Sequence, residues 1–425
     1  MSATPPVPPV PPVLPRSNRT SRTTGSARLK RVPLPLLIAP AAASTALALH
    51  PIRRPFAAAT AGWVLSLAAQ EFPLHVGALV GAATAPALAR RSTRISDMVG
   101  VGLAALTLAG LGAVVARHLA AADVFDRALR EAPAQPRDPV FDPAFDPAPD
   151  STTTTTNSPV SRRTPWLTVL TRPWPLRPRG VRARRGMVYG PDPAANRFDL
   201  YIRTDSVGSA TRGVLTHIHG GHFRAGAPSR ESRAMLFDHA QRGWAAISTT
   251  YHLSPTPESG FPQHLVDIKR LIHWIRTEGP SHGIRADAPI VVAGSSAGAH
   301  IAMMTALTAN DSRFQPEFEA TDTTVAGAIG LYGYYGRLGL KTKDVSDPVR
   351  HPATGAPPVA IIHGTHDTYT PVRGSRRLVE HLRAGSPGPV VYAELPGAQH
   401  GFDAVRTPRY LAVVKAVARF TDRLV

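Results

Sequence analysis

The sequence predicts an α/β fold with a mostly parallel sheet from Gly186 to the C-terminus, and a separate apolar helical module before it. Short β-rich runs alternate with helical stretches in the C-terminal portion, and the runs are bounded by Gly or Pro. Such alternation implies right-handed crossovers and a sheet that helices cover on both faces. Four apolar stretches ahead of Gly186 predict the helical module.

The elements of the α/β portion can be placed from hydrophobic periodicity. The expected strands are Arg197–Arg203, Gly213–His219, Trp244–Thr250, Pro289–Ala293, Val325–Leu331, Val359–His363 and Val390–Leu395. The expected helices are Phe261–Glu278, Ala297–Ala309 and Tyr410–Leu424. One domain over residues 186–425 is long enough to bury a substantial core.

The N-terminal part is expected to be a membrane module. Its apolar stretches are Val32–Leu49, Phe56–Ala69, Phe72–Ala89 and Met98–Ala116. A helix that crosses a bilayer needs about 20 apolar residues, so we expect three or four transmembrane helices over residues 32–117, after a basic disordered tail over residues 1–31. A soluble Ala-rich helical domain is the alternative, and a cleavable signal peptide fits poorly because several apolar stretches follow one another.

The number of spans decides on which side the C-terminal portion lies. With three spans, Arg90, Arg91 and Arg94 share the cytoplasmic side with the basic tail, whereas four spans place them outside. The positive-inside bias therefore favours three spans and an extracytoplasmic C-terminal domain. Residues 118–185, which are rich in Pro, Thr and Arg, are expected to form a linker.

Charge and composition narrow the possible partners. The net charge is +19, and most of the excess lies before Gly186, where basic residues flank apolar stretches instead of alternating with aromatic ones. This pattern is typical of a membrane anchor on anionic lipid and argues against nucleic-acid binding. The chain has no cysteine, which excludes disulfides, thiolate metal sites and a cysteine nucleophile. The composition does not predict an oligomeric state.

The segment V-V-A-G-S-S-A-G-A-H, Val291–His300, is the strongest local motif. An apolar strand runs through Gly294 and Ser296 to Gly298 and then into a helix, which predicts a nucleophile elbow that exposes the Ser296 hydroxyl above the sheet. The turn is so tight that only small residues fit beside the serine. A merely glycine-rich turn is the alternative.

Two later segments supply partners for this serine in the order Ser, Asp, His. Asp367 follows the strand that ends near His363, and His400 follows the strand that ends near Leu395. Open α/β sheets place their sites at such carboxyl ends. We therefore expect Ser296, Asp367 and His400 to be catalytic, with His400 as general base and Asp367 orienting its imidazole. Taken singly, Asp367 could be a helix N-cap and His400 a surface loop residue.

The run T-H-I-H-G-G-H, Thr216–His222, has two interpretations. In the first, the backbone N–H groups of Gly220 and Gly221 join that of Ala297 in an oxyanion hole. In the second, His217, His219 and His222 ligate zinc, because the run resembles the T-H-x-H-x-D-H signature of metallo-β-lactamase-fold hydrolases. Gly221 replaces the aspartate of that signature, and zinc leaves Ser296, Asp367 and His400 unexplained.

Together these motifs resemble the α/β-hydrolase carboxylesterases, in their hormone-sensitive-lipase-like and feruloyl-esterase-like branches. The residues that carry the resemblance are His219–His222, Tyr251–Pro255 with Phe261, Pro262 and Asp267, the elbow, the H-G-x-x-D of His363–Asp367 and the G-x-x-H-G-F of Gly397–Phe402. The whole arrangement of spans, linker and hydrolase is similar to membrane-anchored actinobacterial esterases. The resemblance implies attack by Ser296, an acyl-enzyme and no cofactor or metal.

Departures from the family pattern affect the choice of branch. His222 replaces the third glycine of H-G-G-G, Ser295 stands where many members have Asp, and His252 replaces the usual Arg. Residues His222, Tyr332 and Tyr334 are expected to contact substrate.

The expected function is that of a membrane-anchored serine carboxylesterase or lipase acting on ester or lipid substrates. Two alternatives stay open. One is a non-catalytic membrane protein that retains the hydrolase fold, and the other is the zinc-dependent hydrolase. Amide cleavage by the same machinery is also possible.

Overall fold

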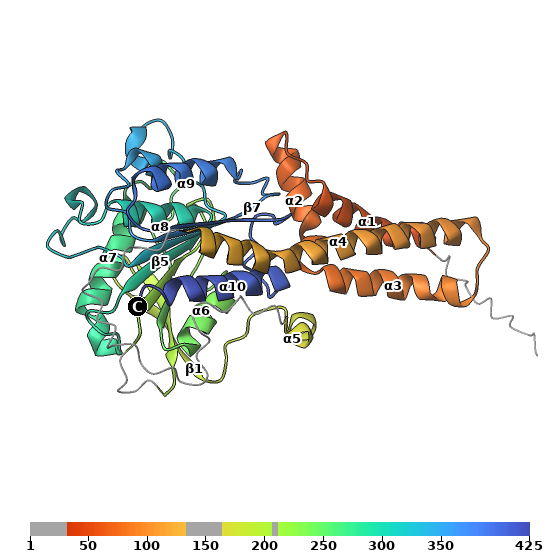
Figure 1. The fold of residues 1–425 in the computed structure, drawn as a ribbon, viewed down its shortest axis with the longest axis horizontal. Coiled ribbons are helices and arrows are strands. Elements are labelled where there is room, and N and C mark those ends of the chain that lie inside the picture. Colours follow the sequence, from red (N-terminus) through yellow and green to blue (C-terminus); the bar gives the residue numbers. More distant parts are fainter. Residues whose placement is uncertain (1–31, 133–163, 206–210) are drawn as a thin grey trace, which may run out of the picture.

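The computed structural model describes residues 32–132, 164–205 and 211–425. The predicted basic tail and residues 133–163 of the predicted linker lie outside the described residues. The described chain consists of an α/β body from which a bundle of helices projects (Figure 1).

The body is built on one sheet of eight strands in the order β1-β2-β4-β3-β5-β6-β7-β8. The strands are β1 Val181–Val188, β2 Arg197–Arg203, β3 Val214–Ile218, β4 Ala245–Thr249, β5 Ile290–Ser295, β6 Gly327–Leu331, β7 Val359–Gly364 and β8 Val390–Leu395. The pairings β1–β2 and β2–β4 are antiparallel, and all others are parallel. The predicted fold class, a mostly parallel α/β-hydrolase sheet, is confirmed.

Helices cover both faces of the sheet, as crossover connections require. The helices of the body are α6 Arg233–Gln241, α7 Gln263–Thr277, α8 Ala297–Leu307, α9 Arg373–Gly385 and α10 Pro408–Thr421. One buried cluster joins the sheet to α7, α8 and α9, and a second joins its other face to α6 and α10. The carboxyl ends of β3, β5, β7 and β8 therefore meet at one edge of a rigid layer.

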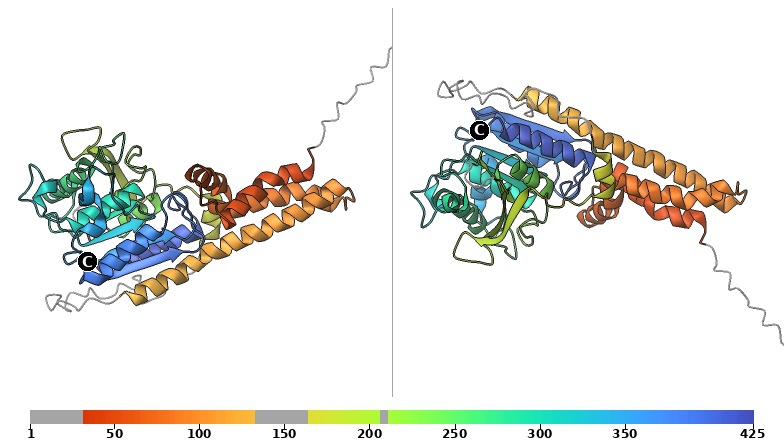
Figure 2. Two further views of the ribbon diagram at one scale, coloured as in Figure 1. Left: turned by 90° about the horizontal axis from the view of Figure 1, so that it is seen from above. Right: turned by 90° about the horizontal axis from the view of Figure 1, so that it is seen from below.

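The N-terminal helices are α1 Leu34–Leu49, α2 Phe56–Glu71, α3 Pro73–Ala89 and α4 Ile95–Glu131. Helices α1, α3 and the first half of α4 project from the body as a long bundle (Figures 1 and 2). Helix α2 bends away from α3 by 81° and returns to the body. A short helix, α5 Trp166–Thr171, lies where the bundle begins, and the His75 Nε2 of α3 is 2.8 Å from the Leu170 carbonyl oxygen.

Helix α4 belongs to both parts of the molecule. Its first half packs against α1 and α3, whereas Ala121, Phe125 and Leu129 are buried among the residues of α10, β7 and β8. The predicted linker of residues 118–185 therefore differs from the structure at both ends. Helix α4 continues past residue 118, where the linker was expected to begin, and ends at Glu131. Strand β1 begins at Val181, before the expected end of the linker. The charged residues from Arg117 onwards suggested the end of the apolar stretch, although small and apolar side chains continue along one face of the helix.

Only one helix of the described residues is long and apolar enough to cross a membrane by itself, namely α4, which contains an 18-residue stretch with a mean hydropathy of 2.2. Helices α2 and α3 reach that length only as a pair with the 81° bend between them, and α1 has 16 residues. The prediction of three or four separate spans is therefore not supported, because three of the four apolar stretches fold into helices of only 16 or 17 residues.

A buried polar contact joins the bundle to the body. The Arg409 guanidinium of α10 is fully buried, with Nη2 2.7 Å from His118 Nε2 of α4 and 3.4 Å from Glu71 Oε1 of α2. Removing one partner of a buried ion pair leaves an uncompensated charge and is strongly destabilising. This contact therefore holds three helices in one fixed arrangement.

Replacing Phe125 with Ala tests whether the second half of α4 is part of the hydrolase core. Phe125 is 1% exposed, so Phe125→Ala should lower the free energy of unfolding by about 3–5 kcal/mol. Leu119→Ala, on the same helix but 44% exposed, is the matched control and should cost less than about 1 kcal/mol. Denaturant unfolding of the full chain in detergent measures both, and equal effects would show that α4 does not contribute to that core.

Candidate active site

Ser296 lies at the turn between β5 and α8, as the motif predicts. Its backbone has φ 55° and ψ −114°, a strained conformation that lifts the side chain out of the sheet. A Cβ on Gly294 would collide with the backbone of Gly298, and a Cβ on Gly298 would collide with the Ile218 carbonyl. Both glycines are thus required by close backbone approach rather than by flexibility.

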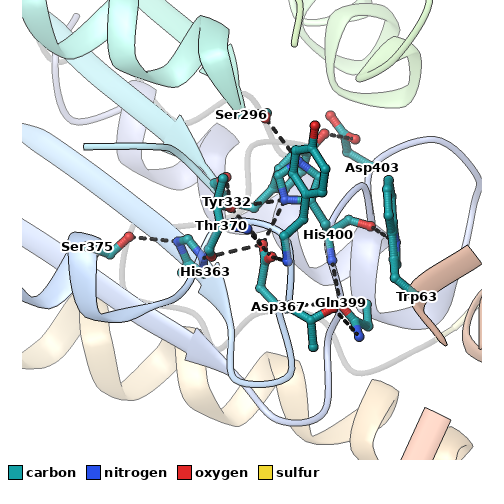
Figure 3. Close-up of polar contacts among 12 residues, drawn as sticks. Trp63, Ser296, Tyr332, His363, Asp367, Thr370, Ser375, Gln399, His400 and Asp403 are labelled. Atoms are coloured by element: carbon teal, nitrogen blue, oxygen red, sulfur yellow. Dashed lines mark hydrogen bonds and ion pairs between the residues drawn. The ribbon is translucent and has the colours of Figure 1, made fainter. Parts of the chain in front are cut away.

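The structure brings the side chains of Ser296, His400 and Asp367 together (Figure 3). His400 Nε2 is 2.9 Å from Ser296 Oγ, and His400 Nδ1 is 2.8 Å from Asp367 Oδ2. Asp367 lies in the loop after β7, residues 365–370, which we call the acid loop. His400 lies in the loop after β8, residues 396–402, which we call the histidine loop. The two alternatives for these residues, a helix cap and a surface position, are disfavoured because both side chains are buried and bonded to each other.

The Asp367 carboxylate is held in its charged form. Burial by itself raises the pKa of Asp367, but the neighbouring His400 and a hydrogen bond from His363 outweigh it and hold this pKa well below its usual value. Its Oδ1 accepts hydrogen bonds from the backbone N–H groups of Tyr369 and Thr370, at 2.9 and 2.7 Å. A permanently charged, immobile carboxylate fixes the tautomer of His400 that leaves Nε2 free to take a proton.

The oxyanion-hole prediction is modified at one position. The backbone N–H of Gly220 donates to Glu231 Oε1. In contrast, no hydrogen bond within the described chain engages the backbone N–H of Gly221, His222 or Ala297. The fold therefore leaves the N–H groups of Gly221, His222 and Ala297 without an internal acceptor, and His222 had been expected only as a substrate contact.

Glu231 explains why Gly220 is unavailable. Its carboxylate is 9% exposed and also pairs with Arg230, with Nη2 2.6 Å from Oε2. Burial and the nearby Asp403 raise the pKa of Glu231, although the Arg230 charge opposes them. Glu231 thus holds the end of β3 in place. Gly221 in turn has φ +124°, and a Cβ there would collide with the Ala225 carbonyl, so the loop after Gly220 needs glycine.

Asp403 is a buried polar residue of the site that sequence reasoning missed. It accepts hydrogen bonds from the hydroxyls of Ser295, at 2.8 Å, Ser232 and Tyr332. Ser295 stands where many members of the family have Asp, so Asp403 supplies a carboxylate beside the elbow from another loop. The signal available in the sequence was its place three residues after His400, which alone does not distinguish it from an exposed loop residue.

The three histidines of the zinc interpretation serve other contacts. His217 Nε2 is 2.9 Å from Ser295 Oγ, and His219 lies between the Gly220 carbonyl and Thr250 Oγ1, at 2.7 and 2.9 Å. Burial lowers the pKa of both imidazoles to about 4. His222 is exposed beside Tyr369. Within the described residues, no three His, Asp or Glu side chains cluster as metal ligands would.

The two tyrosines expected to contact substrate have different surroundings. Tyr332 is 3% exposed, donates its hydroxyl to Asp403 and packs its ring 4.7 Å from that of His400. It therefore packs against the imidazole inside the protein instead of lining an open surface. Tyr334 is 40% exposed and stacks on His300, which leaves part of its ring accessible.

Comparison with known proteins identifies a matching family and several relatives. The BD-FAE family matches residues 198–345. Three curated relatives come from Mycobacterium tuberculosis. The probable carboxylic ester hydrolase LipM is 34% identical over 55% of this chain and 59% of its own length. Esterase LipC is 33% identical over 59% of this chain and 67% of its own length. Esterase LipQ is 30% identical over 84% of this chain and 83% of its own length.

Among solved structures, a butyrate-bound esterase of Thermogutta terrifontis is 23% identical over 58% of this chain and 94% of its own, with a TM-score of 0.48.

The sheet order and the nucleophile elbow define an α/β-hydrolase. With 30% identity to LipQ across 83% of that protein, the chain belongs to the carboxylic ester hydrolase family of this fold. The expected family resemblance is confirmed. The match to LipQ, over 84% of this chain, extends beyond the hydrolase portion into the N-terminal helices, whereas the chain spans only 59% of LipM.

Replacing Glu231 distinguishes its role in holding the loop from a role of Gly220 in catalysis. Glu231→Ala leaves the buried N–H of Gly220 without an acceptor and should cost about 1–3 kcal/mol of stability. Glu231→Gln keeps an acceptor oxygen and should cost clearly less. Thermal unfolding and ester turnover of both variants are measured. If Glu231→Ala, which frees the Gly220 N–H, raised the turnover markedly while Glu231→Gln did not, the Gly220 N–H would belong to the oxyanion hole after all.

Proposed function

We propose that this chain is a serine carboxylic-ester hydrolase that works through an acyl-enzyme on Ser296. The observation that carries the proposal is the unbroken hydrogen-bond chain from Ser296 Oγ through His400 to the buried Asp367. Unbonded backbone N–H groups beside the serine add the second requirement, which is a place for the oxyanion.

The geometry suits a two-step hydrolysis. As Ser296 Oγ attacks the ester carbonyl carbon, His400 Nε2 accepts the hydroxyl proton, and the oxyanion receives hydrogen bonds from Ala297, Gly221 and His222. The C–O bond to the alcohol then breaks, and His400 returns the proton to the leaving alkoxide. His400 then takes a proton from water as the water oxygen attacks the acyl carbon. The bond from that carbon to Ser296 Oγ breaks, Oγ recovers the proton from His400, and the acid is released. Asp367 stays ionised throughout and stabilises the imidazolium.

We also propose that the projecting bundle associates with a lipid bilayer. Large apolar side chains are exposed along it, including Leu36, Leu79, Leu88, Met98 and Leu106, an arrangement that is costly in water. Helix α4 has the length to cross a bilayer. Arg90, Arg91 and Arg94 are exposed in the turn between α3 and α4, and this turn lies at the end of the bundle that is far from the hydrolase (Figure 1). Under the positive-inside bias this arrangement favours an extracytoplasmic hydrolase that meets membrane-resident esters.

A fluorophosphonate probe tests the serine mechanism. The wild-type full chain should be labelled at Ser296. Ser296→Ala should abolish both labelling and ester hydrolysis, whereas Ser281→Ala, at an exposed serine, should change neither.

Asp367→Asn tests the role of the carboxylate and should lower turnover by about 10⁴-fold, because it permits the wrong tautomer of His400. Absence of labelling in an intact, folded wild-type chain would favour the non-catalytic alternative. Chelator-sensitive activity that survives Ser296→Ala would favour the zinc enzyme.

A charge placed on the bundle tests the membrane association. Leu106, in the first half of α4, is 74% exposed, and Leu119, near the body, is 44% exposed. Leu106→Lys should reduce co-flotation with phosphatidylglycerol-containing liposomes, because a lysine at a bilayer centre costs about 2.5–3.5 kcal/mol. Leu119→Lys should float as the wild type does. A wild-type chain that stays out of the lipid fraction would indicate the soluble helical domain instead.

A further inference from the structure

We infer that Trp63 of α2 is a positioning residue for His400, so that the N-terminal helices complete the active site of the hydrolase. This inference rests on the proposed function, because it assigns Trp63 a role only if His400 is the general base. It concerns a residue more than 300 positions away from His400 in a part of the chain that was expected to serve only as an anchor.

The contact between Trp63 and His400 is specific. The indole Nε1 of Trp63 donates a hydrogen bond to the backbone carbonyl of His400 at 3.0 Å. The two rings meet edge to face, with centroids 5.6 Å apart and an interplanar angle of 90°. One side chain from α2 thus restrains both the backbone and the imidazole of the residue that must take the proton (Figure 3).

Trp63 also reaches the acid loop. Its ring lies 5.4 Å from that of Tyr369, which in turn lies 4.9 Å from His400. The backbone N–H of Tyr369 is one of the donors to Asp367 Oδ1. Trp63 therefore packs against both loops that supply partners to Ser296.

Other residues of the N-terminal helices contact the same two loops. The Ala48 carbonyl at the end of α1 is 3.3 Å from His366 Nδ1, and the Ala59 carbonyl of α2 accepts from Thr368 Oγ1 at 3.4 Å. Arg117 of α4 lies against Gly397. Three helices thus approach the acid loop and the histidine loop from one side, and Trp63 is the member that touches His400 itself.

The consequence follows from the distances that proton transfer requires. His400 Nε2 must stay within hydrogen-bond reach of Ser296 Oγ, and a shift of the histidine loop lengthens that contact. Both loops leave the sheet at the ends of β7 and β8 and extend beyond its core. A hydrogen bond and an aromatic contact from an adjacent rigid helix limit that movement.

The test uses the full chain in detergent with a small soluble ester such as p-nitrophenyl acetate. Trp63→Phe keeps an aromatic ring and removes the N–H donor, and Trp63→Ala removes both. Leu65→Ala lies on the same helix, is 64% exposed, and serves as the matched control. Active sites are titrated with a fluorophosphonate, so that kcat is expressed per reactive Ser296. KM, the rate of Ser296 labelling and the thermal midpoint are measured alongside.

The expected result is a change in kcat with little change in KM. Trp63→Phe should lower kcat per titrated site and the labelling rate by about 3- to 10-fold, the range for loss of one hydrogen bond. Trp63→Ala should lower both further, and Leu65→Ala should stay within about 2-fold of the wild type.

Two outcomes would overturn the inference. If both Trp63 variants lost only thermal stability or the number of titratable sites, with unchanged kcat per site, Trp63 would be an ordinary packing residue. If Leu65→Ala reduced kcat as much as Trp63→Phe, the effect would belong to α2 as a whole. Should Trp63→Ala fail to fold, Trp63→Phe alone decides. Failure of the wild type itself to label refutes the proposed function, and is thereby distinguished from failure of this inference.

Discussion

The imidazole of His400 must sit between two oxygens that come from different loops, and the rest of the structure depends on this constraint. Ser296 Oγ and Asp367 Oδ2 lie 2.9 and 2.8 Å from its two nitrogens. A parallel sheet meets the constraint because the carboxyl ends of β5, β7 and β8 share one edge. The buried carboxylates of Asp403 and Glu231 then hold the elbow and the loop after β3 beside the serine.

The helices that precede the hydrolase contribute to its structure as well as projecting from it. The second half of α4 fills part of the core, Arg409 of α10 bonds to α4 and α2, and Trp63 of α2 contacts His400. A helix that is continuous from the bundle into the body cannot tilt in one without moving the other. The orientation of the bundle and the position of the active site are therefore mechanically linked.

Local sequence patterns were sufficient for the fold class and for most of the strands. The predicted strands Arg197–Arg203 and Val390–Leu395 match β2 and β8 to the residue, because alternating or continuous apolar runs have few other solutions. Strand β1 and helices α6 and α9 were missed. The burial pattern of β1 is irregular across a bulge. The stretch from Arg177 to Arg185 also contains five arginines, counting both ends, and this composition resembled that of a linker.

By itself the sequence determined the elbow around Ser296, the order of Ser296, Asp367 and His400, and the apolar character of the N-terminal helices, because each is a short-range pattern. Only the tertiary structure decided that the Gly220 N–H is bound by Glu231, that Asp403 accepts a hydrogen bond from Ser295 of the elbow, and that Trp63 contacts His400. These contacts join residues far apart in the chain, and their geometry depends on how whole layers pack. No local periodicity or spacing encodes such geometry.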